Sequence, residues 1–432
     1  MQNTGHPAGS WYRATVDTPP VRPRLEGDVT VEVGIVGGGF TGLGAALELA
    51  AKGIRVAVLE GADMGSGASG RNGGQLINGY SRGLDVLEAR HGPVATQLGA
   101  DAARQLWDMA EDAKTHLHGL VAQHGIDCDL RPGLIHAWHK PRFADDDQAY
   151  ADFVRRQYGY DKVSLLDAAE VATELGTDVY HGGLFDRGGG HLHPLKLALG
   201  MARAAETAGA ILFEHSNVSR IEAAESGPIL HTAHGRLRCN TVLLCGNGYM
   251  EGLDDTVDAC VMPINNFILV TEPLNDPAIL PRDVAAADSR FVVNYWRKTP
   301  DNRLLFGGGE NYTPWFPKDI AGMVRRNMLK IYPQLSDVAV THAWGGTLAI
   351  TLSRAPFVRR LSRNVVVSAG YSGQGVVLAP YFGKLLERAI TGDDRDIELL
   401  SRLPAPAFFG GRLLRWPAMV AGLSYYALRD RL

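Results

Sequence analysis

Between Thr30 and Glu60 the order of apolar and polar positions predicts a strand, a glycine turn, a helix and a second strand. The segment VEVGIV is almost continuously apolar, as expected for a strand covered on both faces of a parallel sheet, and IRVAVLE repeats this pattern. Between them, TGLGAALELAAKG has the apolar spacing of a helix. Two parallel strands joined by a helix form a βαβ unit. The pattern therefore predicts a doubly wound α/β domain.

The rest of the chain predicts a second domain of a different kind. The strand candidates FILVTEP, RFVVNYWRK and NRLLFGGG follow one another between 261 and 312 without a helix between them, which is typical of an antiparallel sheet. A strand–glycine–helix pattern then returns between Asn364 and Ile390. We therefore expect two interleaved domains and a tail: a Rossmann-like α/β domain at 28–95, 186–255 and 340–395, an α+β substrate-binding domain at 96–185 and 256–339, and a helical tail at 396–432.

Composition and charge narrow the functional classes. The chain has 432 residues, enough for two domains, and its formal net charge of −4 argues against nucleic-acid binding, which needs a basic face. Its four cysteines have no CxxC spacing, so neither a structural zinc site nor a disulfide framework is expected. Because a secretion signal and a long apolar run are absent from the pattern, we expect a cytoplasmic location and no membrane partner.

The first glycine turn predicts a dinucleotide site. Gly37, Gly39 and Gly42 form GxGxxG between a strand and a helix, where glycines allow a tight turn, a close approach to pyrophosphate and close helix packing. Phe40 and Thr41 lie in the first helical turn, whose N–H groups favour phosphate. Glu60 ends the second strand, where its carboxylate can accept from ribose hydroxyls and disfavours a 2′-phosphate. The alternative is a plain α/β turn with packing glycines.

The loop GSGASGRNGGQ, Gly65 to Gln75, indicates a flavin rather than a nicotinamide cofactor. A nicotinamide enzyme has no need of a second small-residue loop here, whereas a flavin ring extends past the pyrophosphate and needs close backbone beside it. The alternative is a flexible serine–glycine linker, although an Arg-Asn pair between glycines is unlike linker composition. The candidate flavin contacts in this loop are Ser66, Ala68, Ser69, Arg71, Asn72, Gly73, Gly74 and Gln75.

These motifs, with GHLHPLKLALG and AGYSGQGVVLAPYFGKLL later in the chain, resemble the D-amino-acid oxidase (DAO) superfamily of FAD-dependent oxidoreductases. The resemblance extends over nearly the whole chain. Within the superfamily, SWYRAT, GGQLINGYSR, NYWRKTPDNRLLFGGG and LSRAPFV are most similar to the bacterial gamma-glutamylputrescine oxidase subgroup.

The resemblance implies where FAD lies. It places a second glycine turn beside the flavin ring, with the N-terminus of the following helix directed at the ring, and it places Val218 near the adenine. Arg71 stands where several relatives have a histidine bonded to the flavin, and no cysteine follows Cys260. The resemblance therefore implies non-covalent FAD. The residues of the second turn are Gly370, Gly373, Gln374, Gly375 and Val376.

The resemblance and the strand pattern give candidate residues for contact with the substrate, but they assign no catalytic residue. Tyr295 and Arg297 share one face of a strand, so one can pack while the other holds a carboxylate. Sheet core remains the alternative for the aromatic residues, a solvated edge charge for Arg297, and a turn cap for Arg354. His191 and His193 form HxH without further metal-ligand spacing, so no metal is expected. The substrate-side candidates are Tyr295, Arg297, Trp344, Arg354 and His191.

The expected reaction is oxidation of an amine C–N bond, with O2 reduced to hydrogen peroxide. A gamma-glutamylputrescine-like substrate leads by resemblance. Val377 occupies the position where sarcosine-oxidase-like members have a carboxylate-binding lysine, which disfavours a small amino acid. An oxidase of N-substituted glycines such as sarcosine or iminodiacetate, a quinone-linked dehydrogenase with the tail on a membrane surface, and a non-catalytic flavoprotein subunit remain open alternatives. The pattern does not predict an oligomeric state.

Overall fold

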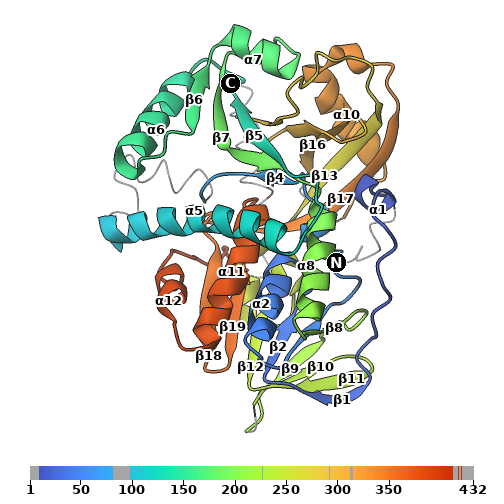
Figure 1. Ribbon diagram of the computed structural model, residues 1–432, viewed down its shortest axis with the longest axis vertical. Helices are drawn as coiled ribbons and strands as arrows, with labels where there is room; N and C mark the ends of the chain where they lie inside the picture. Colours follow the sequence, from blue (N-terminus) through green and yellow to red (C-terminus); the bar gives the residue numbers. More distant parts are fainter. Residues whose placement is uncertain are drawn as a thin grey trace.

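The computed structural model describes residues 9–80, 98–225, 227–290, 292–311 and 315–411, together with Pro417 and Val420. In Figure 1 a helix-covered sheet forms the lower half of the molecule and a larger sheet forms the upper half, with one long helix crossing between them. The expected helical tail is described only at its beginning, as α12 (Arg395–Ser401). The rest of that expectation, from 412 onward, lies almost entirely outside the described residues.

The lower half contains a six-stranded sheet in the order β18-β19-β12-β2-β3-β8. All neighbouring strands are parallel except β18, which is antiparallel to β19. Every residue of β2 and β3 is buried, because both faces of the sheet are covered, and this explains their continuous apolar pattern. The strands are β2 (Val33–Val36), β3 (Val56–Leu59), β8 (Ile211–Phe213), β12 (Thr241–Leu244), β18 (Phe357–Ser362) and β19 (Val365–Ala369).

Three helices cover one face of this sheet, as Figure 1 shows, and α5 crosses over them. The α2 and α11 helices approach closely because each has glycine at the contact: a Cβ added to Gly44 would meet Pro380 O, and one added to Gly383 would overlap Ala45 N. Pro194 opens α8, where its fixed φ suits the first helical position, and His193 caps the helix. The helices are α2 (Phe40–Ala51), α5 (Ala100–Gln123), α8 (Pro194–Thr207) and α11 (Gly375–Ile390).

A four-stranded sheet covers the opposite face through a separate apolar layer. The N-terminal segment ends in β1, which pairs in parallel with β11, and this distant strand supplies backbone partners that the local sequence pattern does not reveal. Two short elements follow β12, a 3₁₀ turn η2 (Asn247–Tyr249) and α9 (Asp255–Cys260). The strands are β1 (Gly27–Thr30), β9 (Arg220–Glu222), β10 (Ile229–His231) and β11 (Gly235–Arg238).

The upper half is a nine-stranded sheet in the order β17-β13-β16-β15-β14-β5-β7-β4, with β6 also paired to β7. It is antiparallel except between β14 and β5. Its strands are β4 (Gln75–Leu76), β5 (Arg131–Ala137), β6 (Val163–Leu166), β7 (Gly183–His191), β13 (Met262–Pro273), β14 (Ala285–Asp288), β15 (Tyr295–Lys298), β16 (Arg303–Asn311) and β17 (Val340–Ile350). The helices and turns around it are α1 (Trp11–Ala14), α6 (Phe143–Tyr158), α7 (Ala168–Leu175), α10 (Ile320–Ile331) and η3 (Pro333–Leu335).

The expected fold, a Rossmann-like domain interleaved with an antiparallel-sheet domain, is confirmed. Two of the expected boundaries differ from the sheet pairing. The boundary at 186 falls inside β7, and the boundary at 340 assigns β17 to the α/β domain, although both strands pair within the nine-stranded sheet. β17 and β7 belong to the nine-stranded sheet because they form hydrogen bonds with β13 and β5, respectively. Local apolar periodicity does not reveal which distant strand a segment will pair with.

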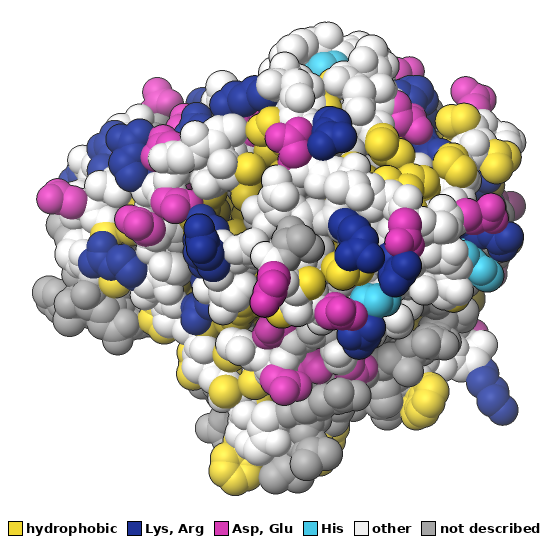
Figure 2. Space-filling view, turned by 90° about the horizontal axis from the view of Figure 1, so that it is seen from below, with side chains coloured by type: hydrophobic (Ala, Val, Ile, Leu, Met, Phe, Trp, Pro, Cys, Tyr) yellow, Lys and Arg dark blue, Asp and Glu magenta, His cyan; other side chains and the backbone are white. Residues whose placement is uncertain are grey.

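The surface and the helices add two observations. On the face shown in Figure 2, acidic and basic side chains are interspersed, and hydrophobic side chains are scattered between them. Within the described ranges, no helix combines the length and the apolar character needed to cross a membrane.

The α2–α11 contact gives a test of the fold. We expect Gly383→Ala to lower the free energy of unfolding by about 1–3 kcal/mol, because the new methyl group meets backbone atoms that cannot rotate away. Gly119→Ala is the matched control: Gly119 is exposed on α5, and no described residue lies within 4 Å of an added Cβ, so the change should stabilise by about 0.5–1 kcal/mol. Denaturant unfolding of both variants measures this. Equal effects in the two variants would contradict the close-contact argument.

Candidate active site

The first glycine turn joins β2 to α2 at the carboxyl end of the parallel strands. Gly37 has φ +105°, and a Cβ there would lie 2.8 Å from Gly246 Cα, in the segment that follows β12. Only glycine therefore fits at position 37. Gly39 caps α2, and Gly42 packs directly against Gly37 O. The first-turn N–H groups of a helix have no acceptor inside the helix. This turn therefore presents donors to an anion, as the sequence predicts.

The side chains of this helical turn connect it to other parts of the site. Ser69 Oγ accepts from Phe40 N at 2.9 Å, so the second loop lies against the helix N-terminus. Thr41 Oγ1 is 2.6 Å from Tyr371 OH, and Tyr371 OH is 2.8 Å from Ser368 Oγ. The Thr41 hydroxyl thus joins the two glycine turns to each other. Because this hydroxyl is already engaged, the predicted contact of Thr41 with the cofactor is assigned to its backbone.

Glu60 lies at the end of β3, as expected, with its carboxylate held by backbone. Its Oε2 accepts from Gly38 N at 2.7 Å, and its Oε1 accepts from Ala62 N at 3.0 Å. Burial raises the pKa of Glu60, while these hydrogen bonds oppose that rise. Carboxylate oxygens have further lone pairs, so the group remains able to accept from a ribose.

The Gly65–Gln75 loop is fixed by side chains from three distant parts of the chain. Trp344 Nε1 donates to Arg71 O at 3.0 Å, Tyr12 OH donates to Asn72 O at 2.8 Å, and Arg297 Nε donates to Gly73 O at 2.9 Å. We call these three residues the carbonyl clamp. Because each of these carbonyls is bonded to the clamp, the loop is held in one conformation against the nine-stranded sheet.

The clamp changes two of the substrate-side assignments. Arg297 was expected to hold a substrate carboxylate or to be a solvated edge charge, but it is only 1% exposed and its guanidinium binds Gly73 O, Lys298 O and Tyr12 OH. Trp344 is buried, and its indole N–H is bonded to the loop. Both side chains support the loop from behind, where Tyr12 of α1 packs against the ring of Trp344 and the guanidinium of Arg297.

Within the loop, the polar side chains mostly bind the loop itself. Asn72 donates to Ala68 O and Ser69 O and accepts from Gly74 N, so its amide shapes the turn. Arg71 is buried and donates to Ser66 O at 2.7 Å and Gly345 O at 3.0 Å.

Burial lowers the pKa of Arg71, but the guanidinium remains a cation within the loop. Gln75 donates to Ala286 O at 2.7 Å in the nine-stranded sheet. Gly74, at φ +73°, packs against Leu192 O, and Gly73 packs against the ring of Tyr295.

The second glycine turn lies between β19 and α11. Gly370 has φ +69°, and its N–H donates to Asn247 Oδ1 at 2.9 Å. The Asn247 side chain therefore helps to fix the second glycine turn. Gly373 has φ +98° and open space around an added Cβ. The side-chain oxygen Oε1 of Gln374 is buried and has no hydrogen-bond partner among the described residues.

This turn fits a flavin. A buried amide oxygen without a donor is costly, and a ligand N–H group removes that cost. The α11 helix begins at Gly375, with Val376 buried in its first turn, so the helix N-terminus faces the same space. Such an N-terminus stabilises negative charge on a ring placed there. The donor-rich turns and the open space at Gly373 are thus suited to FAD.

Two further substrate-side candidates, Tyr295 and Arg354, lie near the loops. The ring of Tyr295 is half-buried against Gly73 and Gly307, and its hydroxyl donates to Asn266 Oδ1. Arg354 has φ +62° in a turn held to the second glycine turn, since Thr351 N donates to Ser372 Oγ at 3.3 Å. Their contact with substrate stays a prediction.

His191 and His193 are both buried, and they have different surroundings. His191 Nε2 bonds Asp283 O at 2.8 Å, and its Nδ1 has no hydrogen-bond partner in the part of the chain that the structure describes. His193 accepts from Lys196 N and lies 3.1 Å from Thr15 Oγ1, so it is structural. Burial lowers the pKa of His193 to about 2, with Arg297 as a further cause. Among the residues that the structure describes, no group of three or more His, Cys, Asp or Glu side chains could hold a metal ion.

The adenine prediction concerns Val218, which is buried in the apolar layer between the six-stranded and four-stranded sheets. Its backbone pairing with the base stays a prediction.

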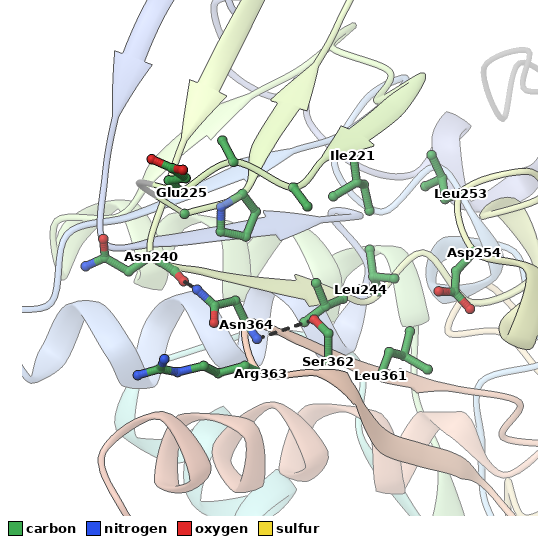
Figure 3. Close-up of a pocket in the computed structure, with 15 residues that line it drawn as sticks. Ile221, Glu225, Asn240, Leu244, Leu253, Asp254, Leu361, Ser362, Arg363 and Asn364 are labelled. Atoms are coloured by element: carbon green, nitrogen blue, oxygen red, sulfur yellow. Dashed lines mark hydrogen bonds between the residues drawn. The ribbon is translucent and has the colours of Figure 1, made fainter.

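A groove of about 690 Å³ lies away from these turns. Figure 3 shows its mixed lining of polar and apolar side chains, where Asn364 Nδ2 donates to Asn240 O at 2.8 Å. Asn240 and Asn364 directly precede β12 and β19, at the amino ends of these parallel strands. Ligands of doubly wound sheets bind at the carboxyl ends, so this groove is not the flavin site.

Sequence reasoning missed Tyr12 as part of the site. SWYRAT was recognised only as a subgroup motif, although Tyr12 contacts both the loop and Arg297. Tyr249 was also missed: it accepts from Thr347 N at 3.2 Å and lies against Gly67, bridging η2, the loop and β17. Only an aromatic residue directly after CGNG hinted at this contact.

Comparison with known proteins identifies the family of the chain. Residues 32–389 match the family model DAO, described as FAD dependent oxidoreductase. The chain is 42% identical over 426 residues to a probable oxidoreductase OrdL of Rhizobium meliloti (strain 1021), and 37% identical over 428 residues to the gamma-glutamylputrescine oxidoreductase of Escherichia coli (strain K12). Each alignment covers 98% of both chains.

Solved structures share the fold. The glycine oxidase of Geobacillus kaustophilus superposes with a TM-score of 0.69 at 23% identity, covering 84% of this chain and 95% of that one. The L-proline dehydrogenase of P. horikoshii superposes with a TM-score of 0.70 at 17% identity, covering 88% and 98%. The chain therefore belongs to the DAO family of FAD-dependent oxidoreductases, and FAD is its cofactor.

Proposed function

We propose that this enzyme is an amine oxidase that acts on gamma-glutamylputrescine or on a similar amine carrying a remote carboxylate. The observation that carries the proposal is the 37% identity to gamma-glutamylputrescine oxidoreductase over 98% of both chains. The aligned region spans both glycine turns, the Gly65–Gln75 loop and the strands of the larger sheet, so the similarity extends beyond the cofactor-binding half of the chain.

The geometry supports a reaction site that lies between the two glycine turns on one side and the larger sheet on the other. The loop contacts α2 through Ser69 and β17 through Arg71, and the second turn contacts α2 through Tyr371. A flavin supplies the two-electron acceptor for such a reaction. The protein must hold the amine uncharged, with its α-C–H beside the ring, and must exclude water. A buried setting favours the neutral amine because desolvation lowers an amine pKa.

Two observations favour a longer substrate over an N-substituted glycine. Val377 is buried on α11 in place of an ammonium group, and the Arg297 guanidinium is engaged by Gly73, Lys298 and Tyr12. Neither position offers a cation to a carboxylate next to the reacting carbon. Oxidation of sarcosine or iminodiacetate would have to rely on another cation, such as Arg354.

The proposal predicts a substrate order. Gamma-glutamylputrescine should bleach the visible flavin absorption under anaerobic conditions faster than putrescine. The expected difference is about 10- to 100-fold in kcat/KM, as is typical when a hydrogen bond to a charged group is lost. Sarcosine, iminodiacetate and D-alanine serve as controls in the same stopped-flow experiment. Faster bleaching by sarcosine or iminodiacetate would show instead that the enzyme is an oxidase of N-substituted glycines. A protein that binds FAD and is bleached by no amine would indicate a non-catalytic subunit.

The electron acceptor has its own test. As an oxidase, the enzyme should form one hydrogen peroxide per amine oxidised in air, because two electrons pass to O2 for each imine that water then hydrolyses. Peroxide and oxygen consumption measured together give this ratio. Turnover that needs a quinone and yields no peroxide would instead identify a dehydrogenase.

FAD should be bound without a covalent bond, because Arg71 occupies the position of the linking histidine and the four cysteines are buried with raised thiol pKa values. Acid precipitation should therefore leave all yellow colour in the supernatant, where chromatography identifies intact FAD. A flavoprotein with a known covalent flavin is the control. Colour retained in the washed pellet would contradict the prediction.

A further inference from the structure

Arg297 is a buried cation directly behind the flavin loop. Its side chain is 1% exposed, and it donates to Gly73 O at 2.9 Å, Lys298 O at 3.1 Å and Tyr12 OH at 3.2 Å. All three acceptors are neutral oxygens. Burying a guanidinium among neutral groups is costly, so the position needs an explanation beyond holding one carbonyl.

Within the described part of the chain, no carboxylate compensates this charge, since these three bonds and a contact with the Tyr12 ring are its interactions. The titratable groups around it are neutral at neutral pH. Burial lowers the pKa of His193 to about 2 and also lowers the pKa of His191, and burial raises the pKa of Tyr12. One positive charge therefore remains in a region of low dielectric beneath Gly73.

We infer that Arg297 is a positioning residue that raises the reduction potential of the bound flavin by placing this uncompensated charge behind the Gly73 carbonyl. Two-electron reduction of a flavin takes up two electrons and, at neutral pH, one proton, so the ring gains one negative charge. A nearby buried cation stabilises that charge more than water would. The inference rests on the proposed function only in placing the flavin ring against the Gly65–Gln75 loop.

The competing explanation is purely mechanical, in which Arg297 only anchors Gly73. Charge and anchoring can be separated, because Arg297→Lys keeps the charge and loses the planar fork of donors, whereas Arg297→Gln keeps a donor and loses the charge. The reduction potential of the holoenzyme, measured without any amine by anaerobic equilibration with a reference dye, reports the charge directly.

We expect Arg297→Gln to lower the equilibrium constant for two-electron reduction at least tenfold, about 30 mV for this couple. Arg297→Lys should remain within threefold of the unmodified protein. Lys298→Gln is the matched control: it removes a half-buried positive charge from the next position of β15, which points to the other face. It should also remain within threefold.

Three results would overturn the inference: an unchanged potential in Arg297→Gln, an equal fall in Arg297→Lys, or an equal fall in Lys298→Gln. If Arg297→Gln yields no holoenzyme, Tyr12→Glu neutralises the intact guanidinium with a carboxylate and is judged by the same tenfold criterion. Failure of the proposed function looks different. A protein that is bleached by no amine still has a measurable potential, and its dependence on Arg297 is decided separately.

Discussion

The hydrogen bonds to three successive carbonyls, at residues 71, 72 and 73, are the contact on which the arrangement of the two halves depends. A loop rich in glycine has high conformational freedom, and ordering it costs entropy. Here the cost is offset by donors from α1, β15 and β17, all buried. Because these donors come from the larger sheet and the N-terminal helix, the same bonds that order the loop also place that sheet over the nucleotide-binding half.

The two glycine turns are joined by a second set of contacts. Glycines at positions 44 and 383 let α2 and α11 pack at backbone distance, and the Thr41–Tyr371 hydrogen bond connects their N-terminal ends. The two helix dipoles consequently start close together and can act on one ligand. Small residues in both helices thus serve the site, since a larger side chain at either position would separate the N-termini.

The sequence predicted the features that depend on local interactions and missed those that depend on contacts between distant segments. GxGxxG, Glu60 and the second glycine turn were recognisable because their requirements are local: positive φ, a helix N-terminus and a carboxylate at a strand end. Alternation also placed Tyr295 and Arg297 on one face correctly, and both contact Gly73. Alternation could not show that β14 and β16 would bury Arg297, or that Tyr12 would reach Asn72 across sixty positions. Those outcomes depend on strand order and on long-range packing.

The origin of the carbonyl clamp has a consequence for synthesis of the chain. Its donors come from positions 12, 297 and 344, so the flavin loop is in place only after about four-fifths of the 432 residues have left the ribosome. Contacts so distant in sequence form late and slowly. The first βαβ unit can assemble early on the nascent chain, while capture of the flavin ring has to wait. Cofactor loading is thereby coupled to synthesis of β17, and a chain that ends before Trp344 lacks one donor of the carbonyl clamp.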